Sequence, residues 1–296
     1  MRKTPRLRIG CSGWNYKSWS GRFYPAGLPA SEWLAFYLAH FDTVETNATF
    51  YRLPTRDTFA SWQAQTPDGF VMAIKASRYL THLKRLAGPE EPIARLFERA
   101  RGLGPRLGPV LYQLPARLER DLPRLERFLG ALPRTIDADG APDLPLQHTI
   151  EFRHPSWYEP ATFALLAAHG VALCLHDMAG SAIDTPGVGP FTYVRFHGAA
   201  GKYFGSYGDD VLDGWARRLA ADWRAGRDVY AYFNNDPDAV STRDARRLRD
   251  RAHAAAGLPA FPARSTSSRS DAPGLRRAGA APARRRTRPR EHGRSA

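Results

Sequence analysis

Residues 191–197 read FTYVRFH, a short apolar run that ends in an arginine and a histidine two positions apart. Seven other segments have the same design, an apolar run of strand length that ends in polar or ionisable residues. Most of the stretches between these segments read as amphipathic helices. Strands that alternate with helices predict a parallel sheet, and eight such units predict its closure into a barrel. In chain order the eight ends are Cys11-Ser12, Glu45-Thr46-Asn47, Lys75, Gln113, Glu151-Phe152-Arg153, His176-Asp177, Arg195-Phe196-His197 and Asn234-Asn235-Asp236.

The predicted fold class is α/β, a TIM-type (β/α) barrel with about eight parallel strands. The connection at residues 178–190 is short and rich in Gly and Pro, so one outer helix is expected to be missing there. An open, doubly wound sheet is the competing architecture, but it binds ligands at a single switch point, whereas polar residues here recur on every strand. The strands are expected at residues 7–11, 43–47, 70–76, 108–114, 149–152, 171–175, 191–196 and 229–233.

The positive charge is concentrated at the end of the 296-residue chain. The net charge is +14, and residues 257–296 contain ten arginines against two acidic residues, which is more than half of the excess. Because this segment is rich in Ala, Pro, Gly and Ser and lacks apolar periodicity, we expect one barrel domain over residues 1–256 followed by a disordered basic tail. The tail either attaches to nucleic acid or another acidic partner, or is a dispensable solvated extension.

The cysteines and the N-terminus predict the compartment. Cys11 and Cys174 both fall within expected strands, and two buried thiols on separate strands indicate a reducing compartment rather than a disulfide framework. Residues 1–9 contain charges but no apolar signal-peptide core, and no run approaches transmembrane length. The sequence therefore predicts a cytoplasmic protein without membrane attachment.

Carboxylates and histidines at the strand ends are the candidate catalytic residues. Side chains at i and i+2 share a strand face, so Glu151 with Arg153 should point into the barrel. The neighbours His176 and Asp177 cannot both point into the barrel from a regular strand, so Asp177 is expected to be the first residue of the loop that follows the strand. The set could act as general acid and base or hold a divalent metal, although no motif requires one. Alternatively it is a buried polar network that closes the barrel mouth. The candidates are Glu45, Glu151, His176, Asp177 and His197.

Cationic, aromatic and amide side chains are the candidate substrate-binding residues. A basic cluster around the third strand, which includes Arg78, Lys84 and Arg85, either holds a phosphate or carboxylate or is a solvated loop. Aromatic residues in the loops after the first two strands either stack a sugar or nucleobase or form a small core over the barrel mouth. The candidates are Trp14, Asn47, Tyr51, Lys75, His82, Gln113, Arg153, Arg195, Asn234 and Asn235.

Several segments stand out along the chain: GCSGW at 10–14, FDTVETNATFY at 41–51, KAS at 75–77 with TH at 81–82, LGP at 107–109 with QLP at 113–115, EFRHPSW at 151–157, YVRFHG at 193–198 and YFNND at 232–236. Together, and in this order over about residues 7–250, they resemble the YecE-like family, domain of unknown function 72. The resemblance implies a TIM-type barrel and no established activity, since the family is named for lacking one. The chain reads Asp244-Ala245 where the family's pattern would lead us to expect Asn-Ala, and the basic tail lies outside the resemblance.

Two functions are compatible with these residues. The first is an enzyme of the hydrolase or lyase type that acts at the strand ends on a small anionic or sugar-like ligand. The second is a non-catalytic module that binds a nucleotide or nucleic acid through its aromatic and basic loops and its tail. The carboxylates expected to face the barrel interior favour the enzyme, because burying so many ionisable groups is costly unless they are used.

Overall fold

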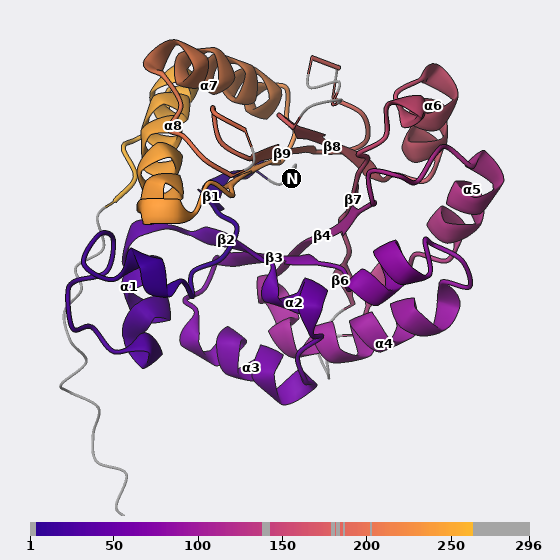
Figure 1. Cartoon of the computed structure of the whole chain (residues 1–296), viewed down its shortest axis with the longest axis horizontal. Helices are drawn as coiled ribbons and strands as arrows, with labels where there is room; N and C mark the ends of the chain where they lie inside the picture. Colours follow the sequence, from indigo (N-terminus) through magenta and orange to yellow (C-terminus); the bar gives the residue numbers. More distant parts are fainter. Residues whose placement is uncertain are drawn as a thin grey trace, which may run out of the picture. The chain divides into compact units, whose positions relative to one another are not determined.

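The computed structural model describes residues 4–137, 143–178, 181, 184–185, 187–201 and 203–262. Eight parallel strands in the order β1-β10-β9-β8-β7-β4-β3-β2 curl into a nearly closed barrel with helices around it (Figure 1). The TIM-type prediction is confirmed, and each strand lies within one residue of its predicted bounds. The strands are β1 (Leu7–Cys11), β2 (Thr43–Thr46), β3 (Val71–Lys75), β4 (Leu107–Gln113), β7 (His148–Glu151), β8 (Ala172–His176), β9 (Thr192–Phe196) and β10 (Val229–Phe233).

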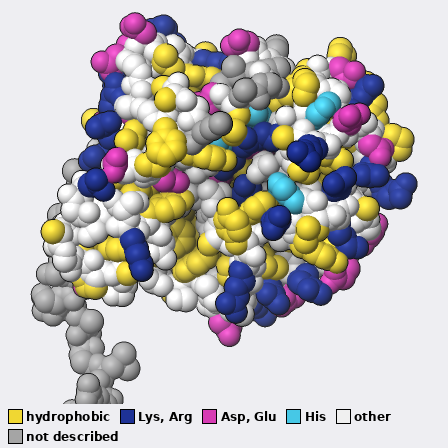
Figure 2. Space-filling model, in the orientation of Figure 1, with side chains coloured by type: hydrophobic (Ala, Val, Ile, Leu, Met, Phe, Trp, Pro, Cys, Tyr) yellow, Lys and Arg dark blue, Asp and Glu magenta, His cyan; other side chains and the backbone are white. Residues whose placement is uncertain are grey.

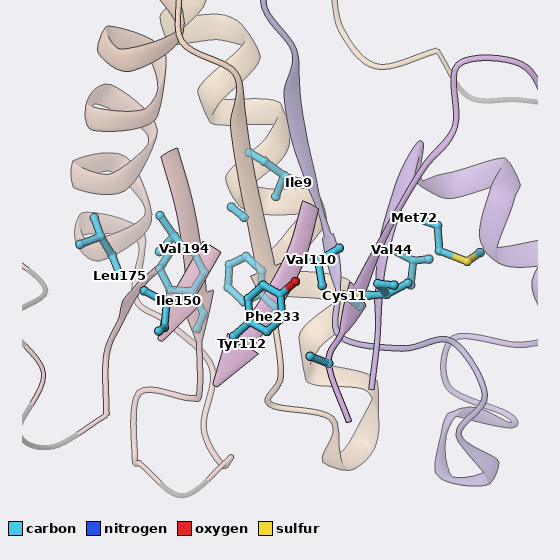
Figure 3. Close-up of a cluster of buried hydrophobic side chains, with 14 of the residues drawn as sticks. Ile9, Cys11, Val44, Met72, Val110, Tyr112, Ile150, Leu175, Val194 and Phe233 are labelled. Carbon is cyan, nitrogen blue, oxygen red and sulfur yellow. The ribbon is translucent and has the colours of Figure 1, made fainter. Parts of the chain in front are cut away.

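The two faces of the strands bury different sets of side chains. One set faces the helices and forms the main core, of which Figure 3 labels Ile9, Cys11, Val44, Met72, Val110, Tyr112, Ile150, Leu175, Val194 and Phe233. The alternate residues form a separate cluster that fills the barrel: Val71, Ala73, Leu111, Ala172, Cys174, Phe191, Tyr193, Tyr230 and Tyr232. Each fully buried apolar side chain contributes about 1.5–3 kcal/mol to folding. The apolar filling gives way to polar side chains at the carboxyl ends of the strands.

A tyrosine closes the seam of the barrel. β1 and β2 are the two ends of the hydrogen-bonded strand order. The hydroxyl of Tyr37 lies between them, accepting from the backbone N–H of Cys11 and donating to the carbonyl of Thr43, both at 3.0 Å. Gly10 permits this close approach, since a Cβ there would lie 2.5 Å from the carbonyl oxygen of Thr43.

The outer layer follows the predicted alternation of strands and helices. In α4, the buried residues Ile93, Leu96, Phe97 and Ala100 follow the spacing of one helical face, as expected of an amphipathic helix. The described residues between β8 and β9 contain no helix, as expected from their Gly and Pro content. The outer helices are α1 (Trp33–His40), α3 (Arg56–Gln65), α4 (Glu90–Ala100), α5 (Leu122–Gly130), α6 (Pro160–Ala168), α7 (Asp209–Arg224) and α8 (Val240–Ala256), and a short α2 (Ala48–Tyr51) follows β2.

Some features were not expected or lie beyond the described residues. Two two-residue strands, β5 (Thr135–Ile136) and β6 (Leu144–Pro145), pair antiparallel outside the barrel. Residues 263–296, which make up most of the predicted tail, lie outside the described part of the chain. Cys11 and Cys174 are buried and unbridged. Among the described residues, no helix combines the length and apolar character needed to cross a membrane.

Candidate functional site

Three strand ends meet at one buried arginine. Arg195, near the end of β9, donates from Nε and Nη2 to the carboxylate of Glu45 on β2, at 2.9–3.1 Å. Its Nη1 donates to Oε2 of Glu151 at the end of β7, at 2.8 Å. Because these three strands are not neighbours in the sheet, the contacts cross the barrel interior. The three side chains therefore point inward, as the alternation along each strand requires.

Both carboxylates of this cluster are surrounded by donors. Glu45 also accepts from the hydroxyl groups of Ser12, at 2.8 Å, and Tyr193, at 2.6 Å, while Glu151 accepts from Nε of Arg153. Burial alone would raise the pKa of Glu151, but the guanidinium groups of Arg153 and Arg195 outweigh burial and hold that pKa well below its ordinary value. A carboxylate kept ionised and fully paired suits a scaffold better than a proton donor.

A second chain of contacts fixes His197, the second residue after Arg195. Nδ1 of His197 lies 3.1 Å from Oδ1 of Asp177, which also accepts from the backbone N–H of His197 at 2.8 Å. The other oxygen of Asp177 accepts from the hydroxyl of Tyr207, which itself accepts from the backbone N–H of Gly198 at 2.6 Å. Since an ionised carboxylate only accepts, these contacts assign the proton of neutral His197 to Nδ1 and the lone pair to Nε2.

The lone pair of His197 faces two guanidinium groups. Nε2 lies 3.1 Å from Nη2 of Arg153 and 3.4 Å from Nη1 of Arg195. Burial is the main cause that lowers the pKa of His197 to about 4; Asp177 acts against burial, and the two arginines reinforce it. The side chain of Arg153 is 10% exposed and that of Arg195 only 1%. Of the two cations beside His197, Arg153 is therefore the one that an incoming anion can reach.

Lys75, at the end of β3, adds a further positive group to the mouth. It is 9% exposed, and its Nζ lies 4.1 Å from the centre of the Phe50 ring. Burial is the main cause that lowers the pKa of Lys75 to about 7. His82 lies in the π-helical turn η3 (Tyr79–Leu83), and burial together with the charge of Lys75 lowers its pKa to about 4. Single π-helical turns are frequent at functional sites.

Two open grooves border this cationic side of the mouth. The larger, of about 310 Å³, is lined by Phe50, Tyr51 and residues from the loop after β3 and from α4. The smaller, of about 230 Å³, is lined by three arginines and a histidine without an acidic residue: Arg78, His82, Arg85 and Arg117, beside Leu83, Pro115 and Ala116. Figure 2 shows Lys, Arg and His side chains gathered around the middle of this face, among hydrophobic ones. Such a lining suits a phosphate or carboxylate group.

The predicted amide and aromatic residues lie around the mouth with varying exposure. Asn47 donates to the carbonyl of Ser12 at 3.2 Å, and within the described residues its Oδ1 has no hydrogen-bond partner. Gln113 and Asn234 are half-buried at the ends of β4 and β10. Tyr51 is 81% exposed, and the half-buried Trp14 packs edge-on against a ring of α3. These five residues leave polar or aromatic groups that a ligand could contact.

Two predicted site residues are not brought into the mouth. His176 is fully buried; its Nε2 lies 2.6 Å from the carbonyl of Phe152, and its Nδ1 accepts from the backbone N–H of Met178. Asn235 is also fully buried and donates to Asp244 at 3.1 Å and to the carbonyl of Gly205. Both side chains hold loops in place and offer a ligand no exposed atom.

The acidic and histidine residues do not form a metal-binding arrangement in the described part of the chain. No three or more His, Cys, Asp and Glu side chains there are grouped to hold an ion. The oxygens of Glu45 and Glu151 face guanidinium groups, and both nitrogens of His176 contact the backbone. This donor set matches an ion-pair scaffold better than a set of metal ligands.

Sequence reasoning missed some residues of the site. Tyr193 and Ser12 bind Glu45, and both share the inward face of their strands, so the i, i+2 spacing from Arg195 could have identified Tyr193. Tyr207, which binds Asp177, lies in a loop after β9. No periodicity in the sequence marks a loop residue of this kind.

Comparisons with known proteins agree with the fold. The model of the family described as "Protein of unknown function DUF72" matches residues 8–267. The chain is 30% identical over 153 residues to UPF0759 protein YecE of Escherichia coli K12, covering 51% of this chain and 50% of that protein, so it spans about half the length of this curated relative. It is 25% identical to UPF0759 protein YunF of Bacillus subtilis strain 168, covering 78% of this chain and 89% of that protein. A crystal structure of a DUF72 family protein from Thermotoga maritima has a TM-score of 0.68 at 25% identity, covering 81% of this chain and 96% of that one.

Proposed function

The chain belongs to the DUF72 family, whose function is unknown, and we propose that it is an enzyme that transfers a proton to or from a small anionic substrate at the mouth of the barrel. His197 is the acid–base group, and Arg153 binds the anion. The observation that carries this proposal is the contact of 3.1 Å between the lone pair of His197 and the guanidinium group of Arg153. His197 is itself only 1% exposed, so a substrate would reach it by binding the more exposed Arg153 beside it.

Binding of the substrate would itself activate the base. In the free protein the pKa of His197 is about 4, which is too low for efficient proton transfer at neutral pH. An anion that binds Arg153 draws its donors away from Nε2 and neutralises its charge, so the pKa of His197 rises. Each unit of that rise corresponds to about 1.4 kcal/mol of interaction between anion and imidazolium. Asp177 keeps the ring oriented and stabilises the imidazolium that forms.

The buried cluster below supports this chemistry without taking part in it. Glu45 and Glu151 fix Arg195, which in turn holds the floor of the site beneath His197. The side-chain amides of Asn47 and Gln113 would orient polar groups of a substrate. Proton transfer next to a bound anion is the common step of the hydrolase and lyase reactions that we expect from the sequence.

One observation favours the second candidate function, the binding of a nucleotide or nucleic acid. The smaller groove is lined by Arg78, Arg85 and Arg117, all of them exposed. Binding through these arginines would weaken steeply with salt. Loss of RNA or DNA binding in an Arg85→Met variant, with the titration of His197 unchanged, would favour this candidate.

The test is the titration of the histidine side chains by nitrogen-15 NMR, in the full-length protein, with and without inorganic phosphate or oxalate. The protein has nine histidines, and a His197→Gln variant identifies the signal of His197. We expect a Nδ1–H tautomer with a pKa of about 4 that rises when either anion is added. Arg153→Met should raise this pKa without an anion and abolish the effect of the anion.

Arg127→Met, an exposed substitution on α5, is the matched control and should leave the titration of His197 unchanged. A pKa of His197 that neither anion moves in the parent protein would contradict the proposal. So would a proton on Nε2, because the lone pair would then not face Arg153.

A further inference from the structure

Lys75 is a buried amine without a partner of opposite charge. Among the described residues, no carboxylate lies within ion-pair distance of its Nζ, and no side chain or carbonyl accepts a hydrogen bond from it; its close contact is the face of the Phe50 ring. The backbone around it is rigid, since the hydroxyl of Thr49 donates to the carbonyl of Lys75 at 2.6 Å and β3 is paired on both sides. Lysine is almost never buried to this degree unless it is paired.

The nearby carboxylates do not compensate for this burial. Glu151 and Glu45 favour the charged form of Lys75, but both are held by guanidinium groups of Arg153 and Arg195, and these arginines oppose a third positive charge. Burial acts in the same direction and is the largest effect, so the pKa of Lys75 falls to about 7. The uncharged amine, which has a free lone pair, is therefore formed more readily at Lys75 near neutral pH than at an exposed lysine.

The composition of the chain points the same way. Only five of the 43 basic residues are lysine, and the other cations at the bottom of the mouth, Arg153 and Arg195, are arginine. A structural or anion-binding cation at the end of β3 could have been arginine, as elsewhere in this chain. Lysine differs from arginine in that it can lose its proton and act as a nucleophile.

We propose that Lys75 is a catalytic nucleophile that captures a small anionic aldehyde or ketone as an imine. This rests on the proposed function, because the anionic group of the same substrate binds Arg153. The Nζ lone pair attacks the carbonyl carbon, and the carbon–oxygen π electrons move to the oxygen, which takes a proton. The nitrogen then loses a proton, the hydroxyl leaves as water after taking another, and a carbon–nitrogen double bond forms. The iminium ion makes a neighbouring carbon acidic, which gives His197 a proton to move.

Reduction by borohydride tests the proposal in the full-length protein. The protein is incubated with pyruvate, sodium cyanoborohydride is added, and adducts are located by mass spectrometry of peptides. The other four lysines are Lys3, Lys17, Lys84 and Lys202, so each site is read separately. We expect one reduced adduct, at Lys75, with more labelling by pyruvate than by acetone, which has nearly the same shape but no charge.

Variants separate reactivity from folding. Lys75→Arg keeps the charge and should abolish the adduct, whereas Lys17→Arg, at an exposed position in the loop that follows β1, should retain it. The labelling rate should rise as the pH passes through about 7, because the amine of Lys75 loses its proton there. The charged and titratable groups around this amine are Glu45, Glu151, Arg153, Arg195 and His82. Because the label is mapped in the parent protein, the test stands even if a variant fails to fold.

The outcomes distinguish the two proposals. Labelling spread over the other lysines, or none at Lys75 with pyruvate, glyoxylate or glyceraldehyde 3-phosphate, would overturn the role of Lys75. If phosphate still moved the pKa of His197, the proposed function would stand. Equal labelling of Lys75 by pyruvate and acetone would instead overturn the anionic substrate class. If, in addition, neither phosphate nor oxalate moved the pKa of His197, the proposed function would be overturned as well.

Discussion

Replacing Arg195 with methionine would remove the cation that joins three strand ends. Methionine fills much of the same volume, but the four hydrogen bonds from the guanidinium group to Glu45 and Glu151 are lost. Glu151 keeps Arg153, whereas Glu45 is fully buried and, among the described residues, keeps two hydroxyl donors. Breaking a buried ion pair by removing one partner costs about 3–5 kcal/mol. At about 2–4 °C per kcal/mol for a domain of this size, the midpoint of thermal unfolding should fall by about 6–20 °C.

Calorimetry from about pH 3 to pH 8 measures this loss and its pH dependence, with Arg127→Met as an exposed control that should change stability by no more than about 0.5 kcal/mol. In the parent, the lowered pKa of Glu151 stabilises the folded state above its ordinary value of 4.5, and this contribution is lost as the pH falls further. Arg195→Met removes one of the two cations that hold the pKa of Glu151 down, so the variant loses part of this pH-dependent contribution and its difference from the parent should shrink toward low pH. A midpoint within about 2 °C of the parent, or a difference that grows toward low pH, would refute the scaffold role.

Two further predictions concern stability away from the ion-pair cluster. Burial lowers the pKa of His148 from 6.5 to about 4. As the pH falls through this range the unfolded chain takes up a proton first, so the free energy of unfolding of the parent should fall by up to about 3 kcal/mol. Urea unfolding should show a smaller fall for His148→Gln, and an equal fall in parent and variant would contradict this reasoning. Gly198 has a φ of 101°, and a Cβ there would lie 2.1 Å from the carbonyl oxygen of Phe204, so Gly198→Ala should destabilise the protein by more than about 1 kcal/mol. Gly214→Ala, within α7 and with open space around it, should instead stabilise it by about 0.5–1 kcal/mol, and similar values for the two variants would show that neither space nor φ decides the outcome.

The strands and their polar ends could be predicted because their signals are local. A period of two along β2, β7 and β9 is enough to place Glu45, Glu151 and Arg195 on inward faces. The same pattern gave His176 and His197 equal standing as catalytic candidates. Only the folded chain separates them, because Phe152 and Met178 occupy the two nitrogens of His176 while the lone pair of His197 faces a cation.

The sequence by itself determined the barrel, the end of it where polar groups gather and the identity of most residues there. The tertiary structure decided which of them are charged. Glu151 is held ionised by arginines from two positions, His197 is held neutral by burial, and Lys75 is close to losing its proton. The reason is that hydrophobic periodicity depends on residues that are neighbours in the sequence. A pKa instead depends on burial and on charges that strands far apart in the sequence bring within a few ångströms.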